Sequence, residues 1–416
     1  MLEFSDRPYV FVPPKMNRLV LALMRQYNLR RLLGSPAKRL SRVIVTNPEL
    51  LHAVRSTAGN RLLFLPNHST HCDSEIMIEC HRQLGVRSLF MAAYDIFLRS
   101  RLEAWVIQHC GVFSIDRDGS DRRAIATAME TLTAGRFALT IFPEGNVLFT
   151  NDSVEDFLQG AAFIALKAAK SLDGPGDIHA VPVSIKATHV TDARPAICRR
   201  LTDIAVTAGT GFDRDRDVQA ELRRIGMIVL RRELEKHDYP LPEGADDDLG
   251  AVLRAVATAI VEALEAEIPR QPKPRDTLVD RIRAIRRFVH EFLLDPEQAD
   301  RHAQAHAWAR QAMLAFRVSS YSGDYVATKP TVDRVGETVE KLMEDQTSTM
   351  PPAYAERHAY VRLGTPVSLS AYRSAFEESP RQAVQVLTDE WEKAVQAGLD
   401  GLNAQLQTPG AELFSP

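Results

Sequence analysis

The sequence predicts an α/β protein with a mostly parallel or mixed sheet flanked by helices, and with a large α-helical insertion or second helical domain. Between residues 61 and 185, short apolar runs alternate with segments of helical periodicity, a pattern typical of parallel strands joined by helices. From about residue 215 to 350 only helical patterns occur. The 416 residues are 45% hydrophobic and 25% charged, which is an ordinary globular composition.

The α/β part begins with a buried strand after a basic N-terminal segment. Predicted strands are Arg61–Pro66, Ser88–Ala92, Gly111–Ile115, Phe137–Phe142 and His179–Ile185. Predicted helices run from Asp73 to about His81, over 121–134 and over Phe157–Ser171. A strand and turn at Tyr360–Leu369, followed by a helix to about Leu406, indicate that the α/β domain is completed near the C-terminus.

The helical block separates these two parts of the sheet. Its predicted helices are 216–237, 249–268, 276–293, 297–316 and 331–345. The expected organisation is therefore a basic N-terminal segment (1–44), an α/β domain (45–214), a helical insertion (215–350), and a final segment that completes the α/β domain (351–416).

Residues 15–33 predict a basic amphipathic helix. Its apolar face is formed by Met16, Leu19, Val20, Leu23 and Tyr27, and no acidic residue occurs between Pro8 and Pro48. Two interpretations stand side by side: binding to an anionic membrane surface, or a packed helix with a solvated basic face. No apolar stretch approaches the ~20 residues that span a bilayer, and the first residues do not resemble a signal peptide. The expectation is a cytoplasmic protein, peripheral on the inner face of the membrane.

Net charge argues against a nucleic-acid-binding protein, and cysteine spacing argues against a zinc-binding or disulfide-stabilised protein. A net charge of −3 argues against a general nucleic-acid binder, which needs a basic surface. The four cysteines are Cys72, Cys80, Cys110 and Cys198. Their spacing predicts neither a zinc site nor a disulfide framework, so reduced thiols are expected.

The first chemical motif is Asn67-His68-Ser69-Thr70-His71-Cys72-Asp73. His68 follows a predicted strand and Asp73 begins a predicted helix, at the sheet edge where ligands gather in parallel α/β proteins. His68 is a candidate general base whose second ring nitrogen donates to the Asp73 carboxylate. The alternatives are a structural His–Asp pair, and a metal site that would also use His71.

Two further motifs end predicted strands. Arg117 follows the predicted strand Gly111–Ile115 and is a candidate to bind a phosphate group. The alternative is a surface ion pair with Asp116 or Asp118. Ile141-Phe-Pro-Glu-Gly-Asn146 gives a tight turn in which Gly145 leaves room for substrate and Glu144 can orient a hydroxyl or an arginine. Pro182 removes a backbone donor from the last strand, which predicts an edge or a strand end.

The order of these motifs resembles that of the glycerophospholipid acyltransferase family, whose type member is 1-acylglycerol-3-phosphate acyltransferase. Members of that family contain four sequence blocks in this order: N-H-x-x-x-x-D, G-x-F-x-x-x-R, F-P-E-G and V-P. Similar blocks stand here at 67–73, 111–117, 142–145 and 181–183. The resemblance covers roughly residues 45–190. Gly364-Thr-Pro366 is similar to a G-x-P near the end of the family's domain.

The resemblance implies transfer of a fatty acyl group from acyl-CoA or acyl-carrier protein to a hydroxyl of a lysophospholipid, without a cofactor or metal. It implies that His68 deprotonates the hydroxyl with support from Asp73, and that Arg117 holds a phosphate. Glu144, Gly145 and Asn146 would shape the acceptor site, with backbone N–H groups near 144–146 facing the oxyanion. Family members often continue F-P-E-G with Thr-Arg-Ser, whereas Asn146-Val-Leu148 stands here, which removes a second phosphate-binding arginine.

Two other functions are alternatives to acyl transfer. A hydrolase of acyl thioesters or lysophospholipids would activate water with the same His68–Asp73 pair. A non-catalytic membrane-binding module would depend on the basic N-terminal helix. Free fatty acid released without a lysolipid acceptor, at a rate matching transfer, favours the hydrolase. Membrane binding without turnover of any lipid tested favours the binding module.

Overall fold

The computed structural model describes residues 7–117, 119, 121–241, 248–269, 271–274 and 276–416. Contacts divide the chain into two compact units. The first comprises residues 194–351 with the two chain ends, 1–9 and 413–416, and the second comprises 10–193 and 352–412. The sequence boundaries at 44, 214 and 350 differ from these, because α8 (Arg194–Thr207) belongs to the helical unit and β1 (Leu40–Thr46) belongs to the sheet.

The second unit is built on one eight-stranded sheet with the order β1-β7-β6-β2-β5-β3-β4, and β8 also pairs with β6. The strands are β1 (Leu40–Thr46), β2 (Arg61–Pro66), β3 (Ser88–Ala93), β4 (Val112–Ile115), β5 (Ala138–Thr140), β6 (Ile178–His189), β7 (Arg357–Leu363) and β8 (Val367–Ser368). All pairs are parallel except those of β6 with β7 and β8. The mixed, mostly parallel sheet with flanking helices confirms the predicted fold class.

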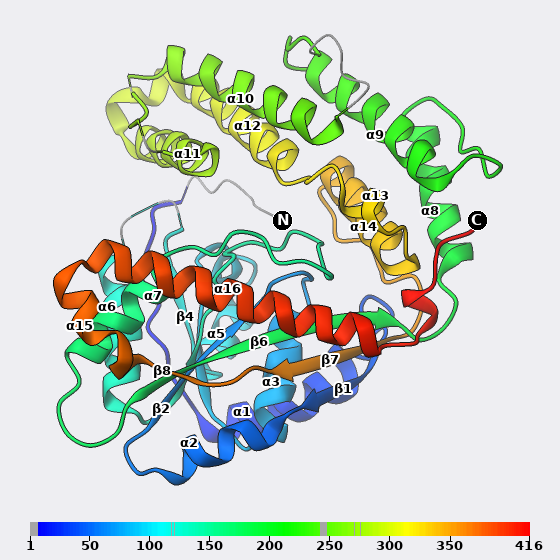
Figure 1. The fold of residues 1–416 in the computed structure, drawn as a ribbon. Helices are drawn as coiled ribbons and strands as arrows, with labels where there is room; N and C mark the ends of the chain where they lie inside the picture. The colour runs from blue at the N-terminus through cyan, green and yellow to red at the C-terminus, as the bar shows by residue number, and fades with distance from the viewer. Residues whose placement is uncertain (1–6, 118, 120, 242–247, 270, 275) are drawn as a thin grey trace. The chain divides into compact units, whose positions relative to one another are not determined.

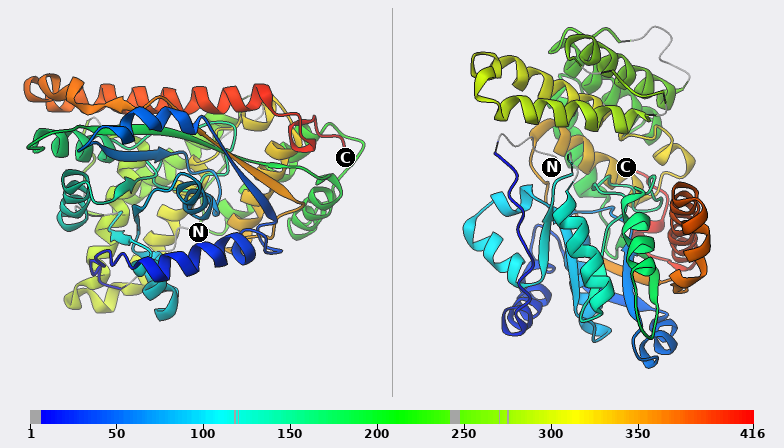
Figure 2. Two further views of the ribbon diagram at one scale, coloured as in Figure 1. Left: turned by 90° about the horizontal axis from the view of Figure 1, so that it is seen from below. Right: turned by 90° about the vertical axis from the view of Figure 1, so that its left-hand side faces the viewer.

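Helices cover both faces of this sheet (Figures 1 and 2). They are α1 (Arg18–Tyr27), α2 (His52–Ser56), α3 (Asp73–Gln83), α4 (Asp95–Leu98), α5 (Arg101–His109), α6 (Arg122–Ala134), α7 (Gly160–Lys170), α15 (Arg373–Glu378) and α16 (Pro380–Gln405). Alternate residues of β2 supply the two cores: Leu63 and Leu65 pack on the side of α6, α7 and α16, while Leu62 and Phe64 pack on the side of α3.

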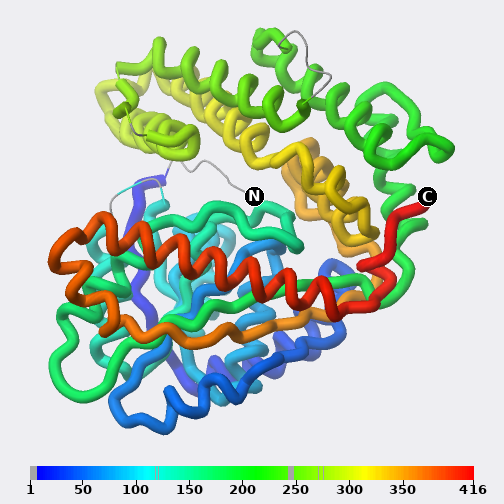
Figure 3. The backbone as a smooth tube through the Cα atoms, in the orientation of Figure 1, coloured from blue at the N-terminus to red at the C-terminus, as the bar shows by residue number. Residues whose placement is uncertain are grey.

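The chain leaves the sheet after β6 and returns at β7, which lies beside β6 (Figure 3). Pro182 lies inside β6, so the expected edge position is wrong. Its missing N–H is tolerated because β8 pairs with β6 before Pro182 and β7 pairs after it. Gly364, in the connection between them, donates to the Pro182 carbonyl at 2.8 Å. A Cβ on Gly364 would lie 3.2 Å from Pro182, so the G-x-P glycine permits this close approach.

The first unit is mainly helical in its described part. Its helices are α8 (Arg194–Thr207), α9 (Val218–Glu235), α10 (Leu249–Glu267), α11 (Leu278–Leu294), α12 (His302–Ser319), α13 (Tyr325–Thr328) and α14 (Val332–Thr347). An apolar core formed mainly by α10, α11 and α12 includes Trp308 and Ile260. None of the helices described in either unit is long and apolar enough to cross a bilayer.

Candidate active site

His68 and Asp73 meet in the loop between β2 and α3. β2 ends at Pro66 and α3 begins at Asp73, so both residues lie at the carboxyl end of a central strand. Nδ1 of His68 lies 3.1 Å from Oδ2 of Asp73. The Asp73 side chain is 1% exposed and that of His68 is 22% exposed. The carboxylate is thus shielded while the imidazole remains accessible, as a general base for a bound substrate requires.

Thr70 holds the Asp73 carboxylate from the other side. Its backbone N–H donates to Oδ2 at 2.8 Å and its hydroxyl donates to Oδ1 at 2.7 Å. With both oxygens fixed, the carboxylate favours a proton on Nδ1 of His68, which leaves a lone pair on Nε2. No role could be assigned to Thr70 from the sequence, although threonine hydroxyls in turns commonly bond nearby groups.

The imidazole of His68 also packs against Phe142. The ring centroids are 4.3 Å apart and the planes are inclined by 32°. Phe142 follows β5, the neighbour of β2 in the sheet, and begins the F-P-E-G turn. This contact therefore joins the turn to His68. The ring is therefore positioned by a hydrogen bond at one nitrogen and an aromatic neighbour on one face.

The Glu144 side chain is hydrogen-bonded to the backbone of the His68 loop. Its Oε1 accepts the backbone N–H of His68 at 2.8 Å, and the side chain is buried. Burial raises the pKa of the Glu144 carboxyl to about 8, although the backbone N–H groups of His68 and Glu155 oppose the shift. The sequence assigned Glu144 to a substrate hydroxyl or an arginine, whereas here it accepts backbone N–H groups.

Gly145 and Asn146 complete this turn. Gly145 adopts φ of +73°, a region that favours glycine, and donates its N–H to the Phe142 carbonyl at 3.1 Å. That N–H is therefore committed to the turn, which removes it from the expected oxyanion donors. Oδ1 of Asn146 accepts from the guanidinium of Arg117 at 3.1 Å.

Arg117 lies after β4 and is paired with Asp95. The guanidinium NH2 group lies 2.7 Å from Oδ2 of Asp95, which begins α4 after β3. The alternative predicted partners were Asp116, whose Oδ1 accepts the N–H of Gly119, and Asp118, which lies outside the described residues. The ion pair with Asp95 was not expected, because it depends on β3 and β4 being neighbours in the sheet.

These side chains follow four strands that are adjacent in the sheet. The order β2-β5-β3-β4 places His68, the Glu144–Asn146 turn, Asp95 and Arg117 in sequence along one edge. Adjacent strands are about 4.8 Å apart. The sheet therefore brings a histidine–carboxylate pair and a guanidinium to one continuous edge, joined by the contacts of Glu144 and Asn146.

Two buried asparagines fix the loops of this site to β6. The Asn67 amide donates to the Ile185 carbonyl at 3.0 Å and accepts its N–H at 2.7 Å. Asn151 makes the same pair of contacts with Ala187, at 2.5 and 3.0 Å. Ser69 donates to the Asn151 side chain at 3.3 Å, which ties the His68 loop to the segment after Asn146. Sequence reasoning did not identify Asn151.

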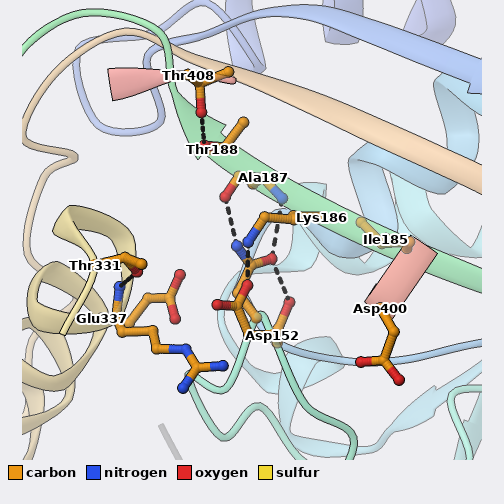
Figure 4. A network of polar contacts seen from close by, with 12 residues as sticks. Asp152, Ile185, Lys186, Ala187, Thr188, Thr331, Glu337, Asp400 and Thr408 are labelled. Carbon is orange, nitrogen blue, oxygen red and sulfur yellow. Dashed lines mark hydrogen bonds and ion pairs between the residues drawn. The ribbon is translucent and has the colours of Figure 1, made fainter. Parts of the chain in front are cut away.

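A buried ion pair adjoins Asn151. Lys186 and Asp152 point toward one another and are both buried (Figure 4). Gln396 of α16 accepts the N–H of Val154 at 2.9 Å and donates to the Asp152 carbonyl at 3.2 Å. The segment between Asn146 and α7 is thus anchored to β6 and α16.

The described residues contain no group of three or more His, Cys, Asp or Glu side chains arranged to hold a metal ion. His71, the third residue of the metal alternative, packs edge-on against Phe149 with ring centroids 5.4 Å apart. The four cysteines are buried and form no disulfide.

Comparison with known proteins agrees with this geometry. Residues 42–186 match the model of the acyltransferase family, and this segment contains His68, Asp73, Arg117 and Glu144. A search of curated proteins gave no match. The sheet-based unit thus carries an acyltransferase domain of the glycerophospholipid acyltransferase family. The match supports acyltransferase activity for this domain.

Proposed function

We propose that this acyltransferase moves a fatty acyl group from acyl-CoA or acyl-carrier protein to a hydroxyl of a lysophospholipid, either 1-acylglycerol-3-phosphate or a related glycerolipid. The observation that carries the proposal is the His68–Asp73 contact of 3.1 Å, which lies at the same edge of the sheet as Arg117. The pair can activate a hydroxyl, and the guanidinium can hold an anionic headgroup.

In the proposed reaction, Nε2 of His68 takes the proton of the acceptor hydroxyl as its oxygen attacks the thioester carbonyl. Asp73 stabilises the resulting imidazolium through Nδ1 and keeps the ring oriented. When the tetrahedral intermediate collapses, the C–S bond breaks and the imidazolium returns its proton to the departing thiolate. The thioester is already activated, so no acyl-enzyme is needed.

Backbone donors near the F-P-E-G turn are proposed to face the oxyanion. Because the N–H of Gly145 is bonded to the Phe142 carbonyl, the proposed donor in this turn is the N–H of Asn146. Arg117 holds the phosphate of the acceptor, with Asn146 orienting the guanidinium. Gly145 leaves room for the glycerol backbone of the acceptor, and Glu144 holds the His68 loop by accepting the His68 N–H.

The test is to incubate the purified protein with labelled acyl-CoA, or with acyl-carrier protein, and a panel of lysophospholipids. Ester formed faster than free fatty acid supports the transferase. Free fatty acid released at the same rate with and without acceptor contradicts it and supports a thioester hydrolase that uses the same His68–Asp73 pair.

We also propose peripheral contact with an anionic membrane through α1 and α5. Leu19 and Leu23 of the predicted apolar face are 77% and 71% exposed, whereas Met16 precedes α1 and packs against the core of the sheet-based unit. Arg25 of α1 donates inward to the Val86 carbonyl at 2.7 Å. On α5, which packs against α1, Leu102 and Trp105 are also exposed. This arrangement favours membrane contact over a packed helix with a solvated basic face.

The proposed location is the cytoplasmic face of a membrane, which suits four cysteines that form no disulfide. Sedimentation with vesicles containing anionic lipid tests the contact. Leu19→Gln together with Leu23→Gln is expected to weaken binding without loss of folding, and salt is expected to weaken it further. Unchanged binding by this double variant would exclude α1 as the anchor. Deletion of the segment is a poorer test, since Val12 and Ser114 exchange hydrogen bonds of 2.8 and 3.1 Å.

A further inference from the structure

The acceptor site pairs its cation with an anion before any substrate is bound. Arg117 donates from NH2 to Asp95 at 2.7 Å and from NH1 to the Asn146 side chain at 3.1 Å. The two charged side chains are 26% and 31% exposed, so a ligand can reach both. Asn146 fixes one side of the guanidinium, and Asp95 lies at the other.

This pairing weakens the site for a phosphate monoester. Such a group carries nearly two negative charges at neutral pH, and Asp95 both repels it and competes for the guanidinium. Asp116, which follows β4 directly, is a further carboxyl next to Arg117 in the chain, and its N–H is accepted by Asp121 at 3.3 Å. Val147 stands two residues after Gly145, where an arginine would have added positive charge.

The same pairing suits a headgroup that carries both signs. A phosphodiester has a single negative charge and two oxygens that match a guanidinium. An ammonium group two carbon atoms away would need an anion next to that guanidinium, and Asp95 is such an anion. Docking would exchange one internal ion pair for two pairs with the ligand.

We infer that Asp95 and Arg117 together recognise a zwitterionic headgroup, and that the acceptor is a lysophospholipid with a phosphodiester linked to an ammonium group. Arg117 binds the phosphodiester and Asp95 binds the ammonium. Asp95 is therefore a specificity-determining residue. The inference rests on the proposed transfer to a lysophospholipid and names the acceptor class.

The test compares four acceptors of equal acyl chain: lysophosphatidylethanolamine, lysophosphatidic acid, lysophosphatidylglycerol and, as a neutral hydroxyl, monoacylglycerol. We expect kcat/KM to be highest for lysophosphatidylethanolamine. Asp95→Asn should lower the ratio of lysophosphatidylethanolamine to lysophosphatidic acid by roughly ten-fold or more, because solvent screens but does not abolish a partly exposed charge pair. Asp95→Glu, which keeps the charge, should retain the wild-type preference.

Asp116→Asn is the matched control, because it removes a charge next to Arg117 while an amide oxygen can still accept the N–H of Gly119. It should leave the ratio within about two-fold, since the carboxylate proposed to receive the ammonium is Asp95, 2.7 Å from the Arg117 guanidinium, and charges outside that pair are screened by solvent. Preference of the wild type for any of the other three acceptors, or an Asp95→Asn ratio equal to the wild-type ratio, would overturn the inference and leave acyl transfer standing.

Binding of water-soluble headgroups separates this inference from the proposed reaction. Glycerophosphoethanolamine and glycerol 3-phosphate are titrated calorimetrically into wild type, Asp95→Asn and Asp116→Asn. Tighter binding of glycerophosphoethanolamine that is lost only in Asp95→Asn supports the headgroup assignment even without turnover. Tighter binding of glycerol 3-phosphate to the wild type, or equal binding of both probes, contradicts it.

Discussion

Replacing Glu144 by glutamine should remove the pH dependence that this carboxyl gives to the free energy of unfolding of the sheet-based unit. Burial raises the pKa of this carboxyl from 4.5 to about 8. Between these values the folded protein holds a proton that the unfolded chain has released, so stability falls as the pH rises. A glutamine stays neutral and lacks this contribution.

The magnitude follows from the linkage relation. One proton taken up on folding changes the free energy of unfolding by about 1.4 kcal/mol per pH unit. From about pH 5 to about pH 7.5, the wild type should therefore lose up to about 3 kcal/mol relative to Glu144→Gln. The variant has a pH-independent cost of its own, since its amide nitrogen faces a backbone donor in place of an oxygen. Only the change of the difference with pH is diagnostic.

Urea denaturation at several pH values measures this difference. Trp391 is buried in the core between the sheet and α16 and reports on the sheet-based unit. A Trp308→Phe background removes the buried tryptophan of the helical unit. Asp156→Asn, an exposed carboxyl in the same segment, is the control and should show a nearly constant difference. A Glu144→Gln difference that stays constant with pH would refute the assignment of a raised pKa.

Two further perturbations test the packing and the proposed catalytic pair, His68 and Asp73. Thr70→Val removes the hydroxyl that donates to Asp73, and we expect its kcat to fall roughly ten-fold, because a hydrogen bond to a charged group contributes about 1.5–3 kcal/mol. Thr70→Ser keeps the hydroxyl and should have a kcat near that of the wild type. Equal activity of the two variants would argue against the contact. Gly398→Ala should destabilise the unit by about 1–3 kcal/mol, because its Cβ would lie 2.0 Å from the Ser184 hydroxyl. Ser184→Ala should relieve part of that cost in the double variant, and strictly additive costs measured by denaturation would contradict the predicted clash.

The strands with continuous apolar runs were predictable from the sequence. β2 has the predicted bounds Arg61–Pro66, and β3 differs by one residue at its end. β1 was not predicted, because Leu40–Thr46 contains Arg42 and continues a basic segment. Its pairing partner is β7, more than three hundred residues later, so no local pattern announces it.

The helical unit shows the same contrast. The predicted helices at 216–237, 249–268 and 276–293 correspond to α9, α10 and α11 with small shifts at their ends, because regular apolar spacing is a local property. α8 was not predicted.

The site shows which functional contacts a sequence can reveal. His68 and Asp73 are five residues apart, so the loop alone brings them together. Asp95 and Arg117 meet only because β3 and β4 are adjacent, and Asn151 reaches Ala187 across another loop. Such contacts depend on the order of strands in the sheet, which local patterns do not specify.

The initial rate of ester formation by His68→Ala and His68→Gln, measured with saturating acyl-CoA and acceptor, tests the central claim most directly. His71→Gln, a histidine change in the same loop, is the matched control. The account predicts a loss of about 10²–10⁴-fold in both His68 variants, with His71→Gln remaining close to wild type. A folded His68→Ala protein that forms ester within a few fold of the wild-type rate would contradict the role of His68 as general base.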